Sequence, residues 1–137
     1  MKRVCICGGG SLGHVVAGWL SAKGKAKVDV LTSHLWHDVI HVSSDQGEIS
    51  GRLDRVDSEP ARLIPDADVV ILCYPGFMIG RTLESICPYL KPDAYVGSIF
   101  SSTGFFFEVH PEPDNGLSDA ANMLELDRLE SLIEELL

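Results

Sequence analysis

The feature that most constrains this chain is a glycine turn directly after a short apolar run. The run covers Arg3–Cys7, and the turn reads Gly8-x-Gly10-x-x-Gly13. Glycine at the first position permits a sharp reversal out of a strand, at the second it lets a ligand approach the backbone, and at the third it lets a helix pack closely. This order predicts a buried strand, a tight turn and a helix, which is the start of a βαβ unit.

The residues after the turn continue this pattern. Apolar side chains recur at helical spacing between Ser11 and Lys23, and Gly24 stands where a glycine commonly ends a helix. Val28–Thr32 then predicts a second strand. A strand, glycine turn, helix and strand within about thirty residues predict a Rossmann-type, doubly wound α/β fold with a mainly parallel sheet.

The remainder of the sequence predicts further elements of the same fold. We expect a central strand over Asp68–Tyr74, a helix over Met78–Cys87 and another buried strand over Ala94–Phe100. Between the second strand and Asp68, the pattern indicates a short helix over Ser33–His41, an inserted hairpin over about Ile40–Val56 around Asp45-Gln46-Gly47, and a turn of helix over Ala61–Ile64 that Pro65 ends.

Charge divides the chain into unequal parts. The net charge is −9, and residues 108–137 hold nine acidic side chains against the single basic Arg128. We therefore expect a domain over 1–107, a linker over 108–117 and an acidic amphipathic helix over 118–137. The apolar seam of this predicted helix consists of Leu126, Leu129, Ile133 and Leu136. It packs either on the chain's own sheet or on a second surface, which a homo-oligomer or a partner domain would supply.

Composition argues against several classes of function. The net charge of −9 disfavours nucleic-acid binding, which needs clustered lysine and arginine. No apolar run is long enough to span a bilayer, and the first residues lack the pattern of a signal peptide. Three of the four cysteines, Cys5, Cys7 and Cys73, lie in apolar strand-like runs, as buried free thiols do. We expect a cytoplasmic protein that binds neither nucleic acid nor membrane.

The glycine turn predicts a site for a dinucleotide's pyrophosphate. Gly8, Gly10 and Gly13 shape the turn, while the backbone amides of Ser11 and Leu12 and the positive end of the helix dipole face the same place. The alternative is that the glycines only shape a tight turn. The strand before the turn and the helix and strand after it favour dinucleotide binding.

The end of the second strand bears on which dinucleotide binds. NAD sites often carry an acidic residue there, on the adenosine ribose. Here Thr32, Ser33 and His34 occupy the position, and Asp29 falls too early. The missing acid favours NADP slightly over NAD, because these three side chains could hydrogen-bond a 2′-phosphate, although no arginine lies nearby.

A second set of ligand-facing residues follows the central strand. Tyr74, Pro75 and Phe77 stand where a doubly wound sheet binds its ligand, outside the carboxyl ends of the strands. Ser101–Gly104 follows the next strand in the same way. The structural alternative is that the proline and glycine residues only end the strands.

Several motifs in order resemble one family. The chain resembles the N-terminal domain of the octopine/nopaline (opine) dehydrogenases over about Lys2–Phe107, with the ketopantoate reductases as a similar group. The motifs are Cys5-Ile6-Cys7-Gly8-Gly9-Gly10 with His14, Leu31-Thr32, Asp68-Val69-Val70-Ile71-Leu72, Pro75-x-Phe77 and Gly104-Phe105-x-Phe107.

The resemblance implies reductive condensation of an amino acid with a 2-oxo acid, using NADH or NADPH. It places Gly8, Gly10 and Gly13 on the pyrophosphate, Thr32 near the adenosine ribose, and two further residues, Pro75 and Phe77, by the nicotinamide ribose. Such enzymes continue into a helical domain with the substrate site and a catalytic histidine.

None of the five histidines matches that catalytic residue. We therefore assign no catalytic residue and expect the chain alone to be catalytically incomplete. His34, His37 and His41 have helical spacing, but no carboxylate or cysteine completes a metal site, so we interpret them as loop or surface residues. The alternative function is a non-catalytic dinucleotide-binding or interaction module that assembles through residues 118–137.

Overall fold

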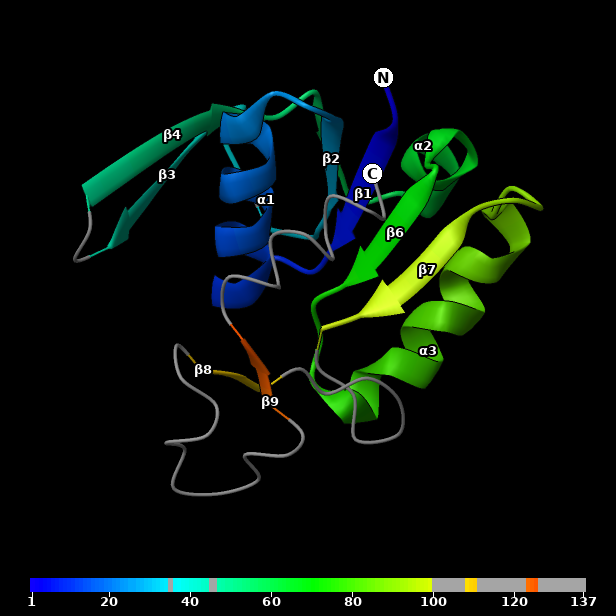
Figure 1. The fold of residues 1–137 in the computed structure, drawn as a ribbon. Helices are drawn as coiled ribbons and strands as arrows, with labels where there is room; N and C mark the ends of the chain where they lie inside the picture. Colours follow the sequence, from blue (N-terminus) through cyan, green and yellow to red (C-terminus); the bar gives the residue numbers. More distant parts are fainter. Residues whose placement is uncertain (35, 45–46, 100–107, 111–122, 126–137) are drawn as a thin grey trace.

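The computed structural model describes residues 1–34, 36–44, 47–99, 108–110 and 123–125. Its centre is a five-stranded sheet in the order β5-β2-β1-β6-β7, and each neighbouring pair is parallel (Figure 1). This order and the helices on both faces confirm the doubly wound, Rossmann-type fold. The strands are β1 (Arg3–Cys7), β2 (Lys27–Leu31), β5 (Arg55–Asp57), β6 (Val69–Leu72) and β7 (Tyr95–Ser98).

The central strand β1 is apolar on both faces because both faces are covered. Val4 and Ile6 pack into one buried cluster, and Cys5 and Cys7 into the other, with no side-chain exposure at any of the four. A strand buried on both sides has no polar alternation, which is why its sequence is a continuous apolar run.

Helix α1 (Ser11–Lys23) has the bounds that the sequence predicted. It ends at Gly24, which is left-handed (φ 65°) and donates its amide to the carbonyl oxygen of Ser21. In Figure 1, α1 covers one face of the sheet, and α2 (Pro60–Leu63) and α3 (Gly76–Ile86) cover the other. Short 3₁₀ turns, η1 (Ile64–Asp66) and η2 (Cys87–Tyr89), follow those two helices.

The inserted hairpin is confirmed as β3 (Val39–Ser44) paired antiparallel with β4 (Gly47–Arg52). It packs against α1 through two glycines: a Cβ added at Gly18 would collide with Val42, and one added at Gly51 would collide with Ser21. The two backbones therefore approach closely, and the hairpin lies beside α1 on the same face of the sheet (Figure 1).

The prediction of a short helix over Ser33–His41 is wrong. The described residues before Val39 form bends and coil, and Val39–His41 belong to β3. Pairing with β4 decides this, since Ile40 lies opposite Gly51 and is only 4% exposed, while its neighbours Val39 and His41 are exposed. A strand buries alternate residues, so it uses this apolar pattern better than a helix would.

Strand β7 differs from the buried strand that was predicted. Tyr95 is 60% exposed and Val96 39% exposed. Among the described strands, β7 pairs only with β6 and forms an edge of the sheet. Strand β5 was not predicted as a separate element: it leaves the hairpin after Arg52 and joins the main sheet beside β2.

Two short strands lie where a linker and a helix were predicted. β8 (Glu108–His110) pairs parallel with β9 (Met123–Glu125), so residues 108–110 of the predicted linker and residues 123–125 of the predicted helix are strands in the structure. The rest of the predicted linker and helix, including the seam from Leu126 to Leu136, lies outside the described residues, as do Phe100–Phe107. No helix within the described part is long and apolar enough to cross a membrane.

Candidate functional site

The glycine turn lies at the carboxyl ends of β1 and β6. Gly8 has φ 128°, donates its amide to the carbonyl oxygen of Leu31 at 3.0 Å, and has no room for a side chain, since an added Cβ would lie 2.5 Å from the carbonyl oxygen of Cys73. At Gly13, a Cβ would collide with the carbonyl oxygen of Gly8. Both glycines therefore have the structural roles that the sequence predicted, reversal of the chain and close packing of α1.

Gly10 differs from these two because the space beside it is open. No heavy atom outside its immediate neighbours lies within 4 Å of a Cβ added there. Gly10 is the N-cap of α1, and its carbonyl oxygen accepts the amide of His14 at 3.0 Å. No side chain caps this helix start, and its first turn holds no acidic residue. The amides of Ser11 and Leu12 thus begin an uncapped helix, an arrangement that suits an anion.

The three residues at the end of β2 do not lie together as an open set. Thr32 is 5% exposed, its amide donates to the carbonyl oxygen of Asp57 at 3.0 Å, and its hydroxyl accepts the amide of His34 at 3.1 Å. The Thr32 side chain also lies directly behind Gly9, where an added Cβ would collide with it. Ser33 and His34 are exposed. The threonine thus supports the turn from behind, and the two residues after it face solvent.

The residues after β6 form the start of α3. Pro75 is the N-cap of this helix, so α3 begins two residues earlier than predicted. Tyr74 is half-buried, and burial raises the pKa of its hydroxyl. Phe77 is 86% exposed, an unusual position for a phenylalanine. Ser101–Gly104, the other predicted loop, lies outside the described residues.

The thiols beneath the turn are packed into the core. Cys5, Cys7 and Cys73 are buried and free, while Cys87 is exposed. Burial raises the pKa of Cys73 to about 12, and a hydrogen bond with Cys5, followed by burial, raises the pKa of Cys7. Cys7 and Cys73 therefore stay protonated at neutral pH, and the buried thiols pack as small apolar residues.

Asp29 has a role that the sequence analysis missed. It is fully buried within β2 and accepts hydrogen bonds from Arg3 at 2.8 and 3.0 Å and from Nε of Arg55 at 3.1 Å. The pKa of Arg55 is raised, chiefly by its hydrogen bond with Asp29. Two guanidinium groups therefore balance the charge of the Asp29 carboxylate inside the sheet. Asp29 lies in the middle of β2 and not at the end of the strand. The pairing of β2 with β5 places Arg55 opposite Asp29, so a prediction of this pairing would have identified the ion pair. The sequence analysis did not predict β5 as a separate strand.

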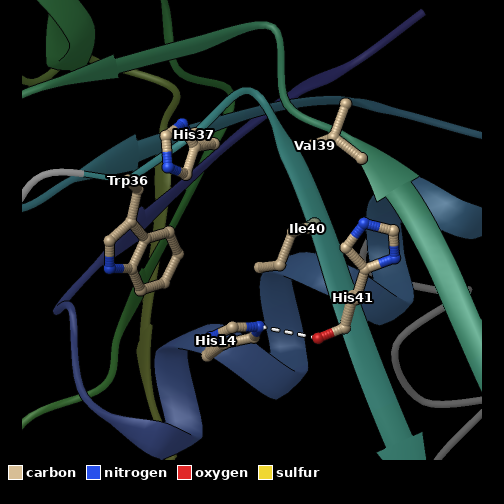
Figure 2. Close-up of a pocket in the computed structure, with 6 residues that line it drawn as sticks. All are labelled: His14, Trp36, His37, Val39, Ile40 and His41. Atoms are coloured by element: carbon tan, nitrogen blue, oxygen red, sulfur yellow. Dashed lines mark hydrogen bonds between the residues drawn. The ribbon is translucent and has the colours of Figure 1, made fainter.

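A cleft of about 380 Å³ opens between α1 and the hairpin (Figure 2). The Nε2 of His14 lies 2.9 Å from the carbonyl oxygen of His41, and the rings of His14 and Trp36 are 5.3 Å apart. As predicted, His14 is a residue of the first helical turns. No three His, Cys, Asp or Glu side chains within the described residues are grouped to hold a metal ion. The lining residues are His14, Trp36, His37, Val39, Ile40 and His41.

The parallel sheet, the glycine turn and the helix beginning at Ser11 define the class of protein: a Rossmann-type domain of the kind found in NAD(P)-dependent oxidoreductases. Residues 4–100 match the family described as Ketopantoate reductase PanE/ApbA. The chain belongs to this family.

Its relatives include opine dehydrogenases. The chain is 28% identical over 147 residues to the opine dehydrogenase of Haliotis discus hannai, covering 94% of this chain and 35% of that protein. It is 27% identical over 121 residues to the octopine dehydrogenase of Pecten maximus, covering 77% of this chain and 30% of that protein. The chain thus spans about a third of the length of these curated relatives.

Solved structures of opine dehydrogenases also resemble this chain. Octopine dehydrogenase in complex with NADH and agmatine has a TM-score of 0.63 at 27% identity, covering 72% of this chain and 28% of that one. A separate short likeness joins 34 residues of the chain, at 56% identity, to the 2-dehydro-3-deoxyphosphooctonate aldolase of Bartonella bacilliformis, covering 25% of this chain and 12% of that protein.

Proposed function

We propose that this chain binds NAD(H) or NADP(H) and forms the cofactor domain of an oxidoreductase of the opine dehydrogenase type. The observation that carries the proposal is the open, uncapped start of α1 at Gly10, directly beside the ends of β1 and β6. A dinucleotide's pyrophosphate fits such a place, because free amides and the helix dipole both favour negative charge.

The residues of this chain would have distinct roles. The amides of Ser11 and Leu12 would bind the pyrophosphate, Ser33 and His34 would face the adenosine ribose, and Tyr74, Pro75 and Phe77 would line the nicotinamide side. When bound, the nicotinamide supplies the hydride chemistry. Thr32 would act by holding the turn in shape, since its hydroxyl is already bonded to the His34 amide.

The reaction that we propose for the whole enzyme is reductive condensation of an amino acid with a 2-oxo acid. It rests on the relatives named opine and octopine dehydrogenase. Members of the wider fold include one solved with NADH and a yersinopine dehydrogenase solved with NADP⁺, so both cofactors remain candidates.

Calorimetric titration with NAD, NADH, NADP and NADPH tests the binding proposal. We expect at least one to bind, and Gly10→Val to weaken binding at least tenfold, equivalent to about 1.4 kcal/mol, because a side chain there fills the space beside the helix start. Gly80→Val is the matched control, since the space beside Gly80, on the exposed side of α3, is equally open. A folded chain that binds none of the four, or equal binding by both variants, would refute the proposal.

A further inference from the structure

On the side of the sheet that α1 covers, the edge formed by β6 and β7 carries apolar side chains that are partly exposed. Tyr95 and Ile99 lie on the same face as Ile71 of β6, because alternate residues of a strand share a face and Ile71 pairs with Gly97. Ile71 and Ile99 are half-buried against the core beneath α1, and Tyr95 is 60% exposed. α1 packs chiefly against β1, β2 and the hairpin, while α2 and α3 lie on the opposite face (Figure 1).

The flank of α1 that points away from the hairpin is apolar as well. Leu12, Val16 and Trp19 have i, i+4, i+7 spacing, so they form one ridge along the helix. All three are half-buried and pack against the same core as Ile71 and Ile99. This ridge and the neighbouring strands form one apolar surface, which we call the β6–β7 surface; it consists of Leu12, Val16, Trp19, Ile71, Tyr95 and Ile99.

Two lysines stand at one end of the β6–β7 surface. Nζ of Lys23 lies 5.0 Å from the centroid of the Trp19 ring, and Nζ of Lys2 lies 5.6 Å from that of Tyr95. α1 runs back from the carboxyl end of β1 to the start of β2, so Lys23 in its last turn lies at the amino ends of the strands. Lys2 precedes β1 and Tyr95 begins β7, so both lie at the same end. That end of the surface therefore carries positive charge.

We propose that residues 126–137 of the same chain cover the β6–β7 surface as an amphipathic helix. The segment follows β9 directly, and its apolar residues have helical spacing. At 1.5 Å per residue, the seam from Leu126 to Leu136 is about 15 Å long, and Tyr95–Ile99 extends over about 13 Å at 3.3 Å per residue. The two therefore match in length. So short a helix is marginal in water and needs a surface to pack on.

Charge and chain direction give this helix one orientation. Its C-terminal end combines the negative end of the helix dipole with most of the acidic side chains, so it is attracted to Lys2 and Lys23. β9 lies beyond the carboxyl ends of β6 and β7 in Figure 1, so a helix that begins at Leu126 starts at the opposite end of the surface. The charged side chains of the segment are Arg128 and the acidic Asp127, Glu130, Glu134 and Glu135.

Thiol cross-linking of the full chain tests both position and direction. In a Cys87→Ser background the remaining thiols are buried, and Tyr95→Cys is combined with either Leu136→Cys or Leu126→Cys. A short bismaleimide should join the Tyr95 and Leu136 positions efficiently, at the mass of a single chain, and the Tyr95 and Leu126 positions poorly. Equal cross-linking of the two pairs, or none in either, overturns the proposal. A product of twice the mass also overturns it, because the segment then lies on a second copy.

A matched pair of variants tests the apolar seam. In a Trp36→Phe background, acrylamide quenching of fluorescence reports the exposure of Trp19 alone. Ile133→Glu should increase this quenching and lower the urea midpoint by about 1 M, because a buried isoleucine is replaced by a charge. Ser131→Glu adds the same charge on the opposite side of the helix and should change neither quantity. Equal effects of the two variants would show that the seam does not contact Trp19.

Discussion

Replacing Asp29 by Asn should destabilise the folded chain strongly. Asp29 is fully buried, while its two partners, Arg3 and Arg55, have side chains 20% and 34% exposed. Removing one partner of a buried ion pair costs about 3–5 kcal/mol, because the remaining charge loses its counter-ion in a poorly solvated place. Both guanidinium groups retain some access to water, so we expect the lower end, about 3 kcal/mol. That is a large part of the roughly 5–15 kcal/mol that stabilises a typical domain.

Urea unfolding followed by circular dichroism measures the loss. With a slope of roughly 1–3 kcal/mol/M, a change of about 3 kcal/mol lowers the midpoint by about 1–3 M. The control is Asp38→Asn, because its ion pair with Arg52 is 60% and 77% exposed and should contribute less than about 1 kcal/mol. If the urea midpoint shifted by the same small amount in both variants, at an unchanged slope, burial would not determine how much the Asp29 ion pairs contribute to the free energy of unfolding.

Four further measurements test other features. Gly24→Ala should cost about 1–2 kcal/mol, measured by urea unfolding, because φ 65° is unfavourable for any residue with a Cβ although the space beside it is open; no loss would contradict the strain. Gly13→Ala should destabilise the chain through a collision with the Gly8 carbonyl oxygen, and it should cost more than Gly80→Ala. A thiol reagent should label Cys87 at once and Cys5, Cys7 and Cys73 only as the chain unfolds, which mass spectrometry can follow; rapid labelling of more than one thiol would contradict their burial. Finally, stability should fall by about 1.4 kcal/mol per pH unit from Cys73 alone above about pH 8.5, because the unfolded thiol ionises there while its folded pKa is about 12. The fall should be smaller in Cys73→Ala.

The first βαβ unit could be predicted from the sequence because local chemistry determines it. β1 and α1 have the expected bounds, and β2 is displaced by one residue. An apolar run buried on both sides, an obligatory glycine turn and a glycine C-cap each act within a few residues of where they stand. The hairpin was also predicted, from its interleaved residues around Gly47.

The errors arise where distant partners decide the structure. Ser33–His41 has helical spacing of apolar side chains, yet pairing with β4 makes its end a strand. The run that contains β7 is apolar enough for a central strand. Among the described strands, however, β7 pairs with β6 on one side and has no strand on the other. Asp29 seemed to be an acid standing too early for a ribose, whereas long-range pairing gives it two arginines.

The candidate site was predictable in its backbone and much less so in its side chains. The amides at Ser11 and Leu12 follow from the helix start alone. The burial of Thr32 depends on Gly9 and on β5, and neither contact can be read from the residues nearby. The cleft needs the packing of the hairpin on α1 through Gly18 and Gly51, which brings His14 against residues 36–41.

That packing has a consequence for how the domain could change in evolution. Helix α1 has its N-cap at Gly10 and, one turn later, carries His14, which forms a wall of the cleft between α1 and the hairpin. The hairpin is fixed to the same helix where Gly18 and Gly51 leave no gap. A substitution that tilts α1 therefore displaces the helix start at Gly10 and the cleft wall at His14 together. The distance between these two parts of the molecule stays constant. Ligand preference is then more easily altered by exchanging side chains along residues 32–41 than by moving the scaffold.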